Sequence, residues 1–209
     1  MPTLLHIDAS PRREQSVSRS LSAAAVRAMQ ERYPDIHVDS LDLASTPVPV
    51  LNGLSAEATA LPPEARTDSQ AASLSGATAL VAQLKAADLV VIGTPMHNFG
   101  MPAVLKGWFD AVIRSGETFS ITESGPQGLL GDMQVLAIVA SGGNYRSGAL
   151  FDGMDHLTPH LRTLFGWVGF ANPQIVHVQP TTFEGEEARA EAIATAERDL
   201  AAAVASILL

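Results

Sequence analysis

Short apolar runs alternate with longer amphipathic stretches along most of the 209 residues. Five of these runs have the length and the β-branched content of strands. We predict strands at Thr3–Asp8, 36–41, 88–94, Gln134–Ala140 and Gln174–Val178. The runs DLVVIGT at 88–94 and QVLAIVA at 134–140 are apolar almost without alternation, which is typical of parallel strands buried on both faces.

The stretches between and after these strands carry apolar residues at helical spacing. Predicted helices cover residues 18–33, 69–86, 102–115, 156–167 and 186–208. Residues 44–65 are rich in Pro, Ser, Ala and Thr and are predicted to cross the surface as a long excursion, and residues 118–130 are predicted to form a small hairpin or flap. Neither a repeat nor a linker is visible, so we predict one α/β domain over residues 1–209, with helices on both faces of a parallel sheet.

Composition narrows the chemistry that this domain can perform. The absence of cysteine excludes disulfides, thiolate zinc sites, iron–sulfur clusters and thiol nucleophiles. The net charge of -9 argues against nucleic acid as a partner, because duplex binding needs clustered Lys and Arg. The N-terminus does not resemble a signal peptide and no segment resembles a membrane span, so we expect a cytoplasmic protein without a membrane partner. Redox chemistry would need a bound organic cofactor or a metal without sulfur ligands.

Ligands of such sheets bind beyond the carboxyl ends of the strands, which directs attention to the loop at residues 9–18. This loop contains Ser10, Ser16 and Ser18 and opens the first helix, whose free N–H groups favour an anion. It lacks the phosphate motifs of nucleoside triphosphatases and dinucleotide folds. Ser16 or Ser18 could equally be a simple helix cap, and the sequence leaves both interpretations open.

Two further loops follow predicted buried strands. Residues 94–100 read TPMHNFG, a polar turn in which Met96 and Phe99 could contact a flat heterocycle or belong to the core. Residues 140–148 begin with Ala140 and Ser141 and contain the pair Gly142 and Gly143, which lets main chain approach a ligand but also occurs in ordinary turns. The occurrence of all three loops at strand ends favours a shared binding site.

The most specific segment of the chain is PMHNFGMPAVLKGWFDAVIRSGETF at residues 95–119. It resembles the pattern PMYNF, LK, FD and RxGxTF of the FMN-dependent NADH:quinone oxidoreductases, also known as azoreductases, in the flavodoxin-like superfamily. Residues 8–12 and 16–18 are similar to the phosphate loop of this family, and residues 140–143 and 157–170 are similar to its later regions. The resemblance covers nearly the whole chain. It implies a flavodoxin-like, doubly wound fold with five parallel strands and helices on both faces.

The resemblance also implies roles for individual residues. Those that would hold the phosphate of FMN are Ser10, Ser16, Val17 and Ser18. Those that would flank the flavin ring are Met96, His97, Asn98 and Phe99, and those that would close over its pyrimidine end are Ala140, Ser141, Gly142 and Gly143. Family members are usually homodimers with the substrate pocket at the interface, which Phe119 and Phe165 would line.

The implied activity is electron transfer from NADH or NADPH, through bound FMN, to quinones and aromatic azo compounds by a ping-pong mechanism. No catalytic side chain is expected, because the flavin carries the chemistry. Protons would come from water, with His97 as an alternative donor. The chain departs from the family pattern at two places. His97 replaces a common Tyr, which would change the packing on the ring or add a titrating group beside the flavin. Ala140-Ser141 replaces a common Ser-Arg pair, which removes a cation and would weaken stabilisation of the reduced flavin or alter the nicotinamide preference.

Three other functions remain open at this point. A flavodoxin-like electron carrier or a non-catalytic flavin sensor would also bind FMN. A metal hydrolase would draw on the histidines at positions 6, 97, 156, 160 and 177, although no HExxH motif is present. We expect Arg12, Arg13 and Arg19 to be mainly solvated, with one of them able to meet a phosphate.

Overall fold

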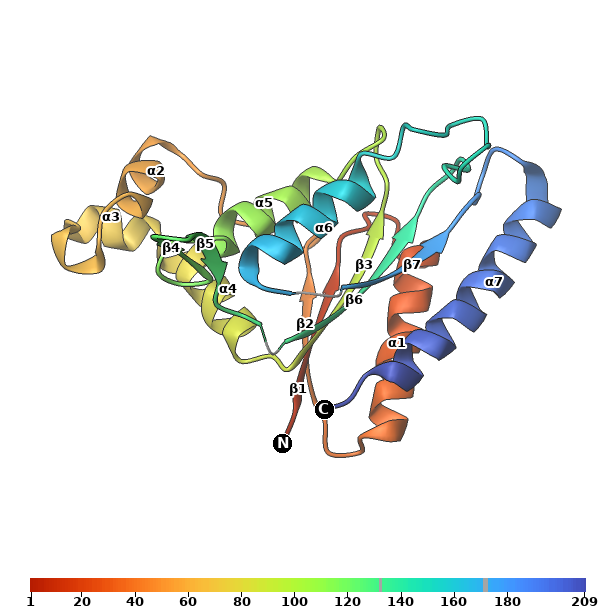
Figure 1. Ribbon diagram of the computed structural model, residues 1–209, viewed down its shortest axis with the longest axis horizontal. Coiled ribbons are helices and arrows are strands. Elements are labelled where there is room, and N and C mark those ends of the chain that lie inside the picture. The colour runs from red at the N-terminus through yellow and green to blue at the C-terminus, as the bar shows by residue number, and fades with distance from the viewer. Residues whose placement is uncertain (132, 171–172) are drawn as a thin grey trace.

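A sheet of five parallel strands runs through the middle of the computed structural model, which describes residues 1–131, 133–170 and 173–209 (Figure 1). Its strands, in spatial order, are β2 (His37–Asp42), β1 (Thr3–Asp8), β3 (Leu89–Pro95), β6 (Gln134–Ala140) and β7 (Gln174–Val178). This order is the flavodoxin-like one, which confirms the predicted fold class. The order reverses direction between β1 and β3, so the loops after these two strands flank the switch point.

Helices cover both faces of the sheet (Figure 1). One face packs against α1 (Val17–Arg32) and α7 (Gly185–Ser206), and the other against α4 (Ser75–Lys85), α5 (Ala103–Val112) and α6 (Leu157–Val168). Successive residues of one strand enter different cores: Leu4 joins the α1 and α7 side, whereas Leu5 and Ile7 join the other. Because both faces are buried, the central strands need the continuous apolar runs seen in the sequence.

The predicted helix at 69–86 is wrong in one respect, because the structure contains two helices there. Leu74 follows α3 (Asp68–Ser73) as its C-terminal capping residue and donates its N–H to the carbonyls of Ala71 and Ala72, and α4 begins at the next residue. The turn buries Leu74 to 2% exposure. Hydrophobic spacing runs without a break through this point, so periodicity alone does not register the change of direction.

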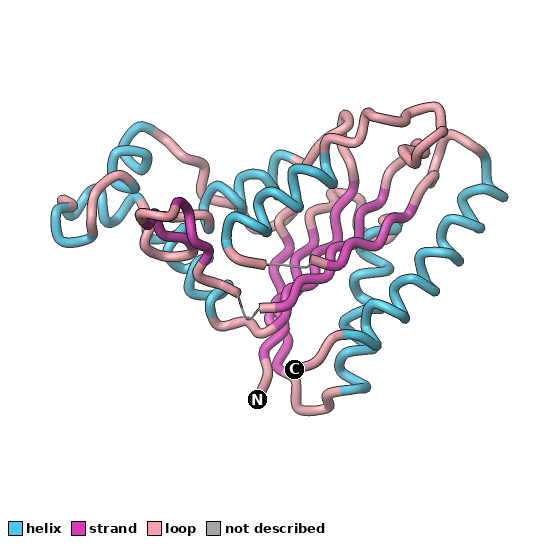
Figure 2. Tube along the Cα trace, in the orientation of Figure 1, coloured by secondary structure: helices cyan, strands magenta, loops and turns pink. Residues whose placement is uncertain are grey.

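The predicted excursion at 44–65 contains a helix of its own, α2 (Gly53–Thr59), followed by a 3₁₀ turn, η1 (Pro63–Ala65). Asn52 caps α2 by accepting from the Ser55 N–H, while the Ser55 hydroxyl lies 2.9 Å from the Asn52 N–H. α2 and α3 project from one end of the molecule (Figure 2). The predicted hairpin is confirmed as the antiparallel pair β4 (Phe119–Thr122) and β5 (Gly125–Gly128).

Candidate functional site

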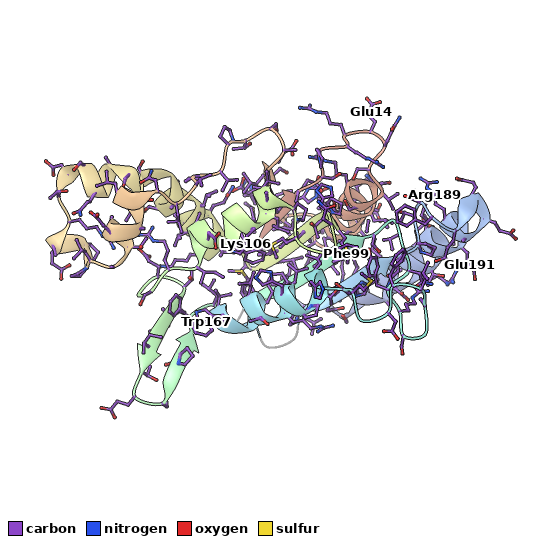
Figure 3. All side chains as sticks on the ribbon, turned by 90° about the horizontal axis from the view of Figure 1, so that it is seen from above. Glu14, Phe99, Lys106, Trp167, Arg189 and Glu191 are labelled. Carbon is purple, nitrogen blue, oxygen red and sulfur yellow. The ribbon has the colours of Figure 1, made fainter. Side chains whose placement is uncertain are left out.

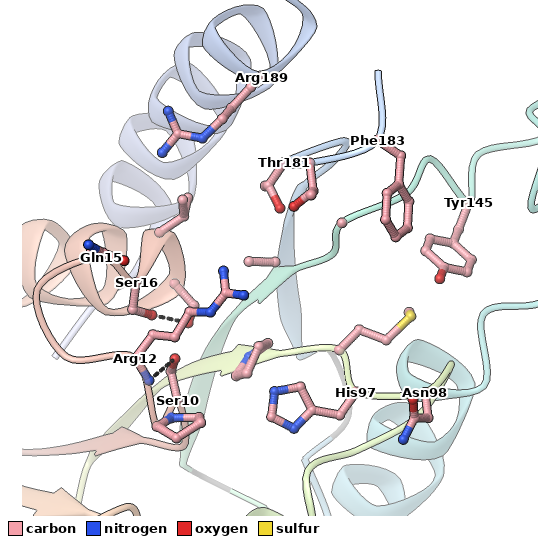
Figure 4. Close-up of a pocket in the computed structure, with 18 of the residues that line it drawn as sticks. Ser10, Arg12, Gln15, Ser16, His97, Asn98, Tyr145, Thr181, Phe183 and Arg189 are labelled. Carbon is pink, nitrogen blue, oxygen red and sulfur yellow. Dashed lines mark hydrogen bonds between the residues drawn. The ribbon is translucent and has the colours of Figure 1, made fainter. Parts of the chain in front are cut away.

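A pocket of about 610 Å³ lies where the carboxyl ends of β1, β3, β6 and β7 meet (Figure 4). This volume is within the usual range of small-molecule sites. The described residues that line it are Ser10, Pro11, Arg12, Gln15, Ser16, Val17, Ser18, Pro95, Met96, His97, Asn98, Phe99, Ala140, Gly142, Tyr145, Phe151, Thr181, Thr182, Phe183 and Arg189.

The loop after β1 supplies the polar end of the pocket, defined by Ser10, Arg12, Ser16 and Ser18. The Ser16 side chain accepts from the Arg19 N–H at 3.3 Å, so Ser16 caps α1. The Ser16 and Ser18 hydroxyls lie 3.2 Å apart and are almost fully buried, yet both residues line the pocket. Ser16 therefore caps α1 and lines the pocket at the same time, so the two interpretations left open by the sequence are compatible. The first N–H groups of α1 have no partner within the helix and favour an anion at this end.

A partly buried polar network lies behind this loop. Arg19 donates from Nε to the Ser10 carbonyl at 2.9 Å, and its guanidinium pairs with Asp42 and with Asp8. Asp8 in turn accepts from the Ser22 hydroxyl at 2.9 Å. The expectation that Arg19 is mainly solvated is therefore wrong: two carboxylates and a carbonyl turn the side chain inward and fix the main chain at Ser10.

Burial and hydrogen bonding together set the pKa values in this network. Burial lowers the pKa of His6, whose Nε2 lies 3.0 Å from the Ser22 hydroxyl, and burial raises the pKa of Asp8. At Asp42 burial is the largest single influence and opposes the charged form, but the hydrogen bonds to this carboxylate, led by the one from Arg19, together with the Arg19 charge outweigh it, and the pKa is lowered. The network also needs Gly93, since a Cβ there would lie 2.5 Å from Asp8 Oδ1. The charge of Arg19 is balanced by Asp8 and Asp42 and is not presented to a ligand in the pocket.

The loop after β3 forms a strained two-residue turn. The His97 N–H donates to the Gly100 carbonyl at 3.0 Å, and the reverse bond has the same length. Asn98 and Phe99 both have positive φ angles, 47° and 69°, as in a type I′ turn. A left-handed conformation costs a residue such as Phe about 1–2 kcal/mol. The turn holds Phe99, 39% exposed, over the carboxyl ends of the strands (Figure 3).

The loop after β6 contributes only part of what the sequence predicts. Ala140 and Gly142 line the pocket, whereas Ser141 and Gly143 are not among its described lining residues. The Ser141 hydroxyl turns inward and donates to the Gly143 carbonyl at 3.0 Å. A Cβ on Gly143 would lie 2.5 Å from the Phe151 ring. Gly143 is therefore a glycine because Phe151 packs on its main chain.

A fourth loop, after β7, also lines the pocket and was missed in the sequence. The Thr181 N–H donates to the Ser141 carbonyl at 3.0 Å and the Thr182 N–H to the Gly142 carbonyl at 3.1 Å, which ties this loop to the one after β6. The strand-end rule applied to Gln174–Val178 would have identified residues 181–183, although nothing local in the sequence points to Arg189 on α7.

Four aromatic rings and one methionine line the opposite end of the pocket, the aromatic end, which is defined by Met96, Phe99, Tyr145, Phe151 and Phe183. The Tyr145 and Phe151 rings stack with centroids 5.4 Å apart, and Phe99 meets Tyr145 edge-on at 6.4 Å. Burial raises the pKa of Tyr145. Such surfaces favour a flat, apolar ligand part.

The two residues expected to line a substrate pocket at a subunit interface lie outside this cavity. Phe165 is 1% exposed and packs in the core against Phe109 and Phe170, because its position on α6 faces the sheet. Phe119 begins β4 and packs edge-on against Trp167. Trp167, which is labelled in Figure 3, is 40% exposed. Neither Phe165 nor Phe119 belongs to the described lining of the pocket.

The two ends of the pocket together fit FMN, which combines a phosphate with a flat ring system. The polar end supplies hydroxyl and helix N–H donors for a phosphate, and the aromatic end supplies contact area for the ring. Among the described residues, no group of three or more His, Asp or Glu side chains is placed to hold a metal ion. In the same part of the chain no helix is both long and apolar enough to cross a bilayer.

Comparisons with known proteins agree with this geometry. A family model described as a flavodoxin-like fold matches residues 2–204. The chain is 38% identical over 201 residues to an FMN-dependent NADH:quinone oxidoreductase of Laribacter hongkongensis, covering 96% of this chain and 99% of the relative. An azoreductase crystal structure from Bacillus anthracis str. Sterne superposes with a TM-score of 0.91 at 27% identity, covering 99% and 100% of the two chains. An FMN-dependent NADH-azoreductase from Bacillus anthracis str. Ames Ancestor, in complex with FMN, gives 0.84 at 26% identity, covering 98% and 100%.

Proposed function

The chain belongs to the flavodoxin-like family of FMN-dependent NADH:quinone oxidoreductases, and from this premise we propose that it transfers electrons from NADH, through bound FMN, to quinones and aromatic azo compounds. The observation that carries the proposal is the pocket itself. A hydroxyl-rich helix N-terminus and an aromatic wall face the same cavity at the carboxyl ends of the strands.

The residues that would hold the phosphate of FMN are Ser10, Ser16, Val17 and Ser18. The residues that would contact the ring are Met96, His97, Asn98, Phe99, Ala140 and Gly142. Ser141 and Gly143 would act indirectly, by shaping the loop after β6. Bound FMN would supply hydride and electron transfer between the nicotinamide and the acceptor.

The protein's own groups position the ligands and control the surroundings of the ring. The turn at 97–100 is held by paired backbone hydrogen bonds, so the Asn98 side chain would be presented at the ring with little loss of conformational freedom. Aromatic side chains would exclude water from the reacting centre. His97 lines the pocket and would donate a proton to the reduced acceptor, with water as the alternative source.

We further propose that NADH and the acceptor use the open side of one pocket in turn, which gives ping-pong kinetics. A homodimer would cover this side, with Phe119 near the interface because it lies beside the exposed Trp167. The cytoplasm, where reduced nicotinamides are available, is the proposed location.

Anaerobic titration of the FMN-loaded protein with NADH tests the proposed function. Visible flavin absorbance should bleach with NADH and return when a quinone is added. Initial rates at several concentrations of both substrates should give parallel double-reciprocal lines. An electron carrier or a sensor would bind FMN without oxidising NADH, and that result would remove the enzyme assignment. Repeating the titration with NADPH measures the donor preference.

A further inference from the structure

The charges around the pocket differ from those of the whole chain. The protein carries a net charge of -9, yet the described residues that line the pocket include Arg12 and Arg189 and no Asp or Glu. A cavity with this local balance attracts an anion in spite of the overall negative charge.

The two arginines approach the polar end from opposite sides (Figure 4). Arg12 lies in the loop after β1, where its backbone N–H donates to the Ser10 hydroxyl at 3.3 Å. Arg189 extends from α7, an element that follows the loop after β7. Two guanidinium groups from segments far apart in sequence therefore face one space beside Ser16.

Both guanidinium groups are available to a ligand. The partner of Arg189 is Glu186, at 3.1 Å, and this carboxylate is 83% exposed, so the pair is weak. No ion pair among the described residues involves Arg12. Arg19 provides the contrast, because Asp8 and Asp42 already bind it.

We propose that Arg12 and Arg189 form a clamp that binds the phosphate monoester of FMN from its solvent side. The serines and the α1 N-terminus supply only neutral donors, whereas the phosphate is a dianion near neutral pH. Guanidinium groups bind phosphate through paired, charge-assisted hydrogen bonds. The clamp rests on the proposed function, since it assumes that FMN is the occupant. Through Arg189, this clamp gives α7 a role in retaining the cofactor.

Flavin affinity measured with and without the phosphate tests this assignment. Flavin-free protein is titrated with FMN and with riboflavin, and flavin fluorescence gives each dissociation constant. R189A and R12A should each weaken FMN binding about tenfold, because each removes a charge-assisted contact. Riboflavin binding should not change. Raising the salt concentration should weaken FMN binding less in these variants than in the wild type.

Matched variants separate the clamp from general effects. R198A removes another α7 arginine, which bonds to Thr195 and does not line the pocket, and it should leave FMN binding unchanged. E186Q frees Arg189 from its carboxylate partner and should tighten FMN binding. Thermal unfolding of the flavin-free variants should match the wild type.

The failures of the two proposals are distinguishable. If R189A and R12A bind FMN as the wild type does, or weaken riboflavin equally, the clamp is overturned while the enzyme assignment stands. If FMN affinity is unchanged and only the KM for NADH rises, the arginines bind the phosphates of the donor, which also overturns the clamp. A wild-type chain that binds neither flavin would overturn the proposed function together with the clamp.

Discussion

The polar end of the pocket comes mostly from one loop, residues 10–18, whereas the aromatic end collects rings from three loops that are far apart in sequence. A partly buried hydrogen bond from Arg19 to the Ser10 carbonyl and the Arg19 ion pairs fix the first region. Ring packing and the strained turn at Phe99 hold the second. The difference separates two tasks: a fixed set of donors retains the cofactor, and a wall of rings with few directional bonds accepts varied flat substrates. The following predictions test that division, from the largest expected effect to the smallest.

Among the variants compared, Gly93→Ala should cause the largest loss of stability, and this loss should reduce FMN binding at the polar end. Its Cβ would meet Asp8 Oδ1 at 2.5 Å and Ser22 Oγ at 2.7 Å, within the network behind the loop. Overpacking of this kind costs about 1–3 kcal/mol of unfolding free energy. Urea denaturation measures the loss, and FMN affinity should fall with it.

Gly166→Ala is the matched control, because a Cβ at this α6 position meets nothing within 4 Å. It should leave FMN binding intact and raise stability by up to about 1 kcal/mol through helix propensity. Equal stability of the Gly93 variant and the wild type would show that the network is not tightly packed.

Phe99→Gly should separate stability from binding at the aromatic end. Glycine relieves the positive φ of 69°, and Asn-Gly is the preferred pair for such a turn, so stability should rise by about 1 kcal/mol. Loss of the ring contact should weaken FMN binding about tenfold. Riboflavin should be affected to the same degree, since the phosphate is not involved. A drop in stability would contradict the assignment of strain to this residue.

Ser16→Ala and Ser18→Ala should separate capping from ligand binding within the polar end. Ser16 caps α1, so its loss should cost about 1 kcal/mol of stability and also weaken FMN. Ser18 should affect FMN binding by about fivefold with little change in stability. Thermal unfolding and FMN titration of both variants measure this. Identical profiles for the two serines would contradict the separation.

The smallest expected effect is a pH dependence of stability from His6. Burial lowers its pKa from 6.5, so the unfolded chain binds the proton more readily below that value, and stability falls as pH drops through the region. Asp8 opposes this trend at more acidic pH, because burial raises its pKa and the folded state then binds its proton first. His6→Gln should reduce the loss of stability between about pH 7.5 and 5.5. An unchanged slope would assign the dependence to other groups, such as His177, whose pKa burial also lowers.

Features encoded by contiguous residues were predictable from the sequence. The buried strands show as apolar runs, and the loops after β1 and β3 show as polar turns at their ends. Features that depend on packing between loops were not. Tyr145, Phe151 and Phe183 look like ordinary loop residues until the bonds from Thr181 and Thr182 draw two loops together. Likewise, nothing local distinguishes Arg19, bound by Asp8 and Asp42, from Arg12, which faces the pocket.

A crystal structure of the chain grown with FMN tests the central claim most directly. The account predicts the phosphate against Ser10, Ser16 and Ser18 at the start of α1, and the ring system beside Met96 to Phe99 and Tyr145. A ring system seated among the serines, or FMN bound outside this pocket, would contradict it.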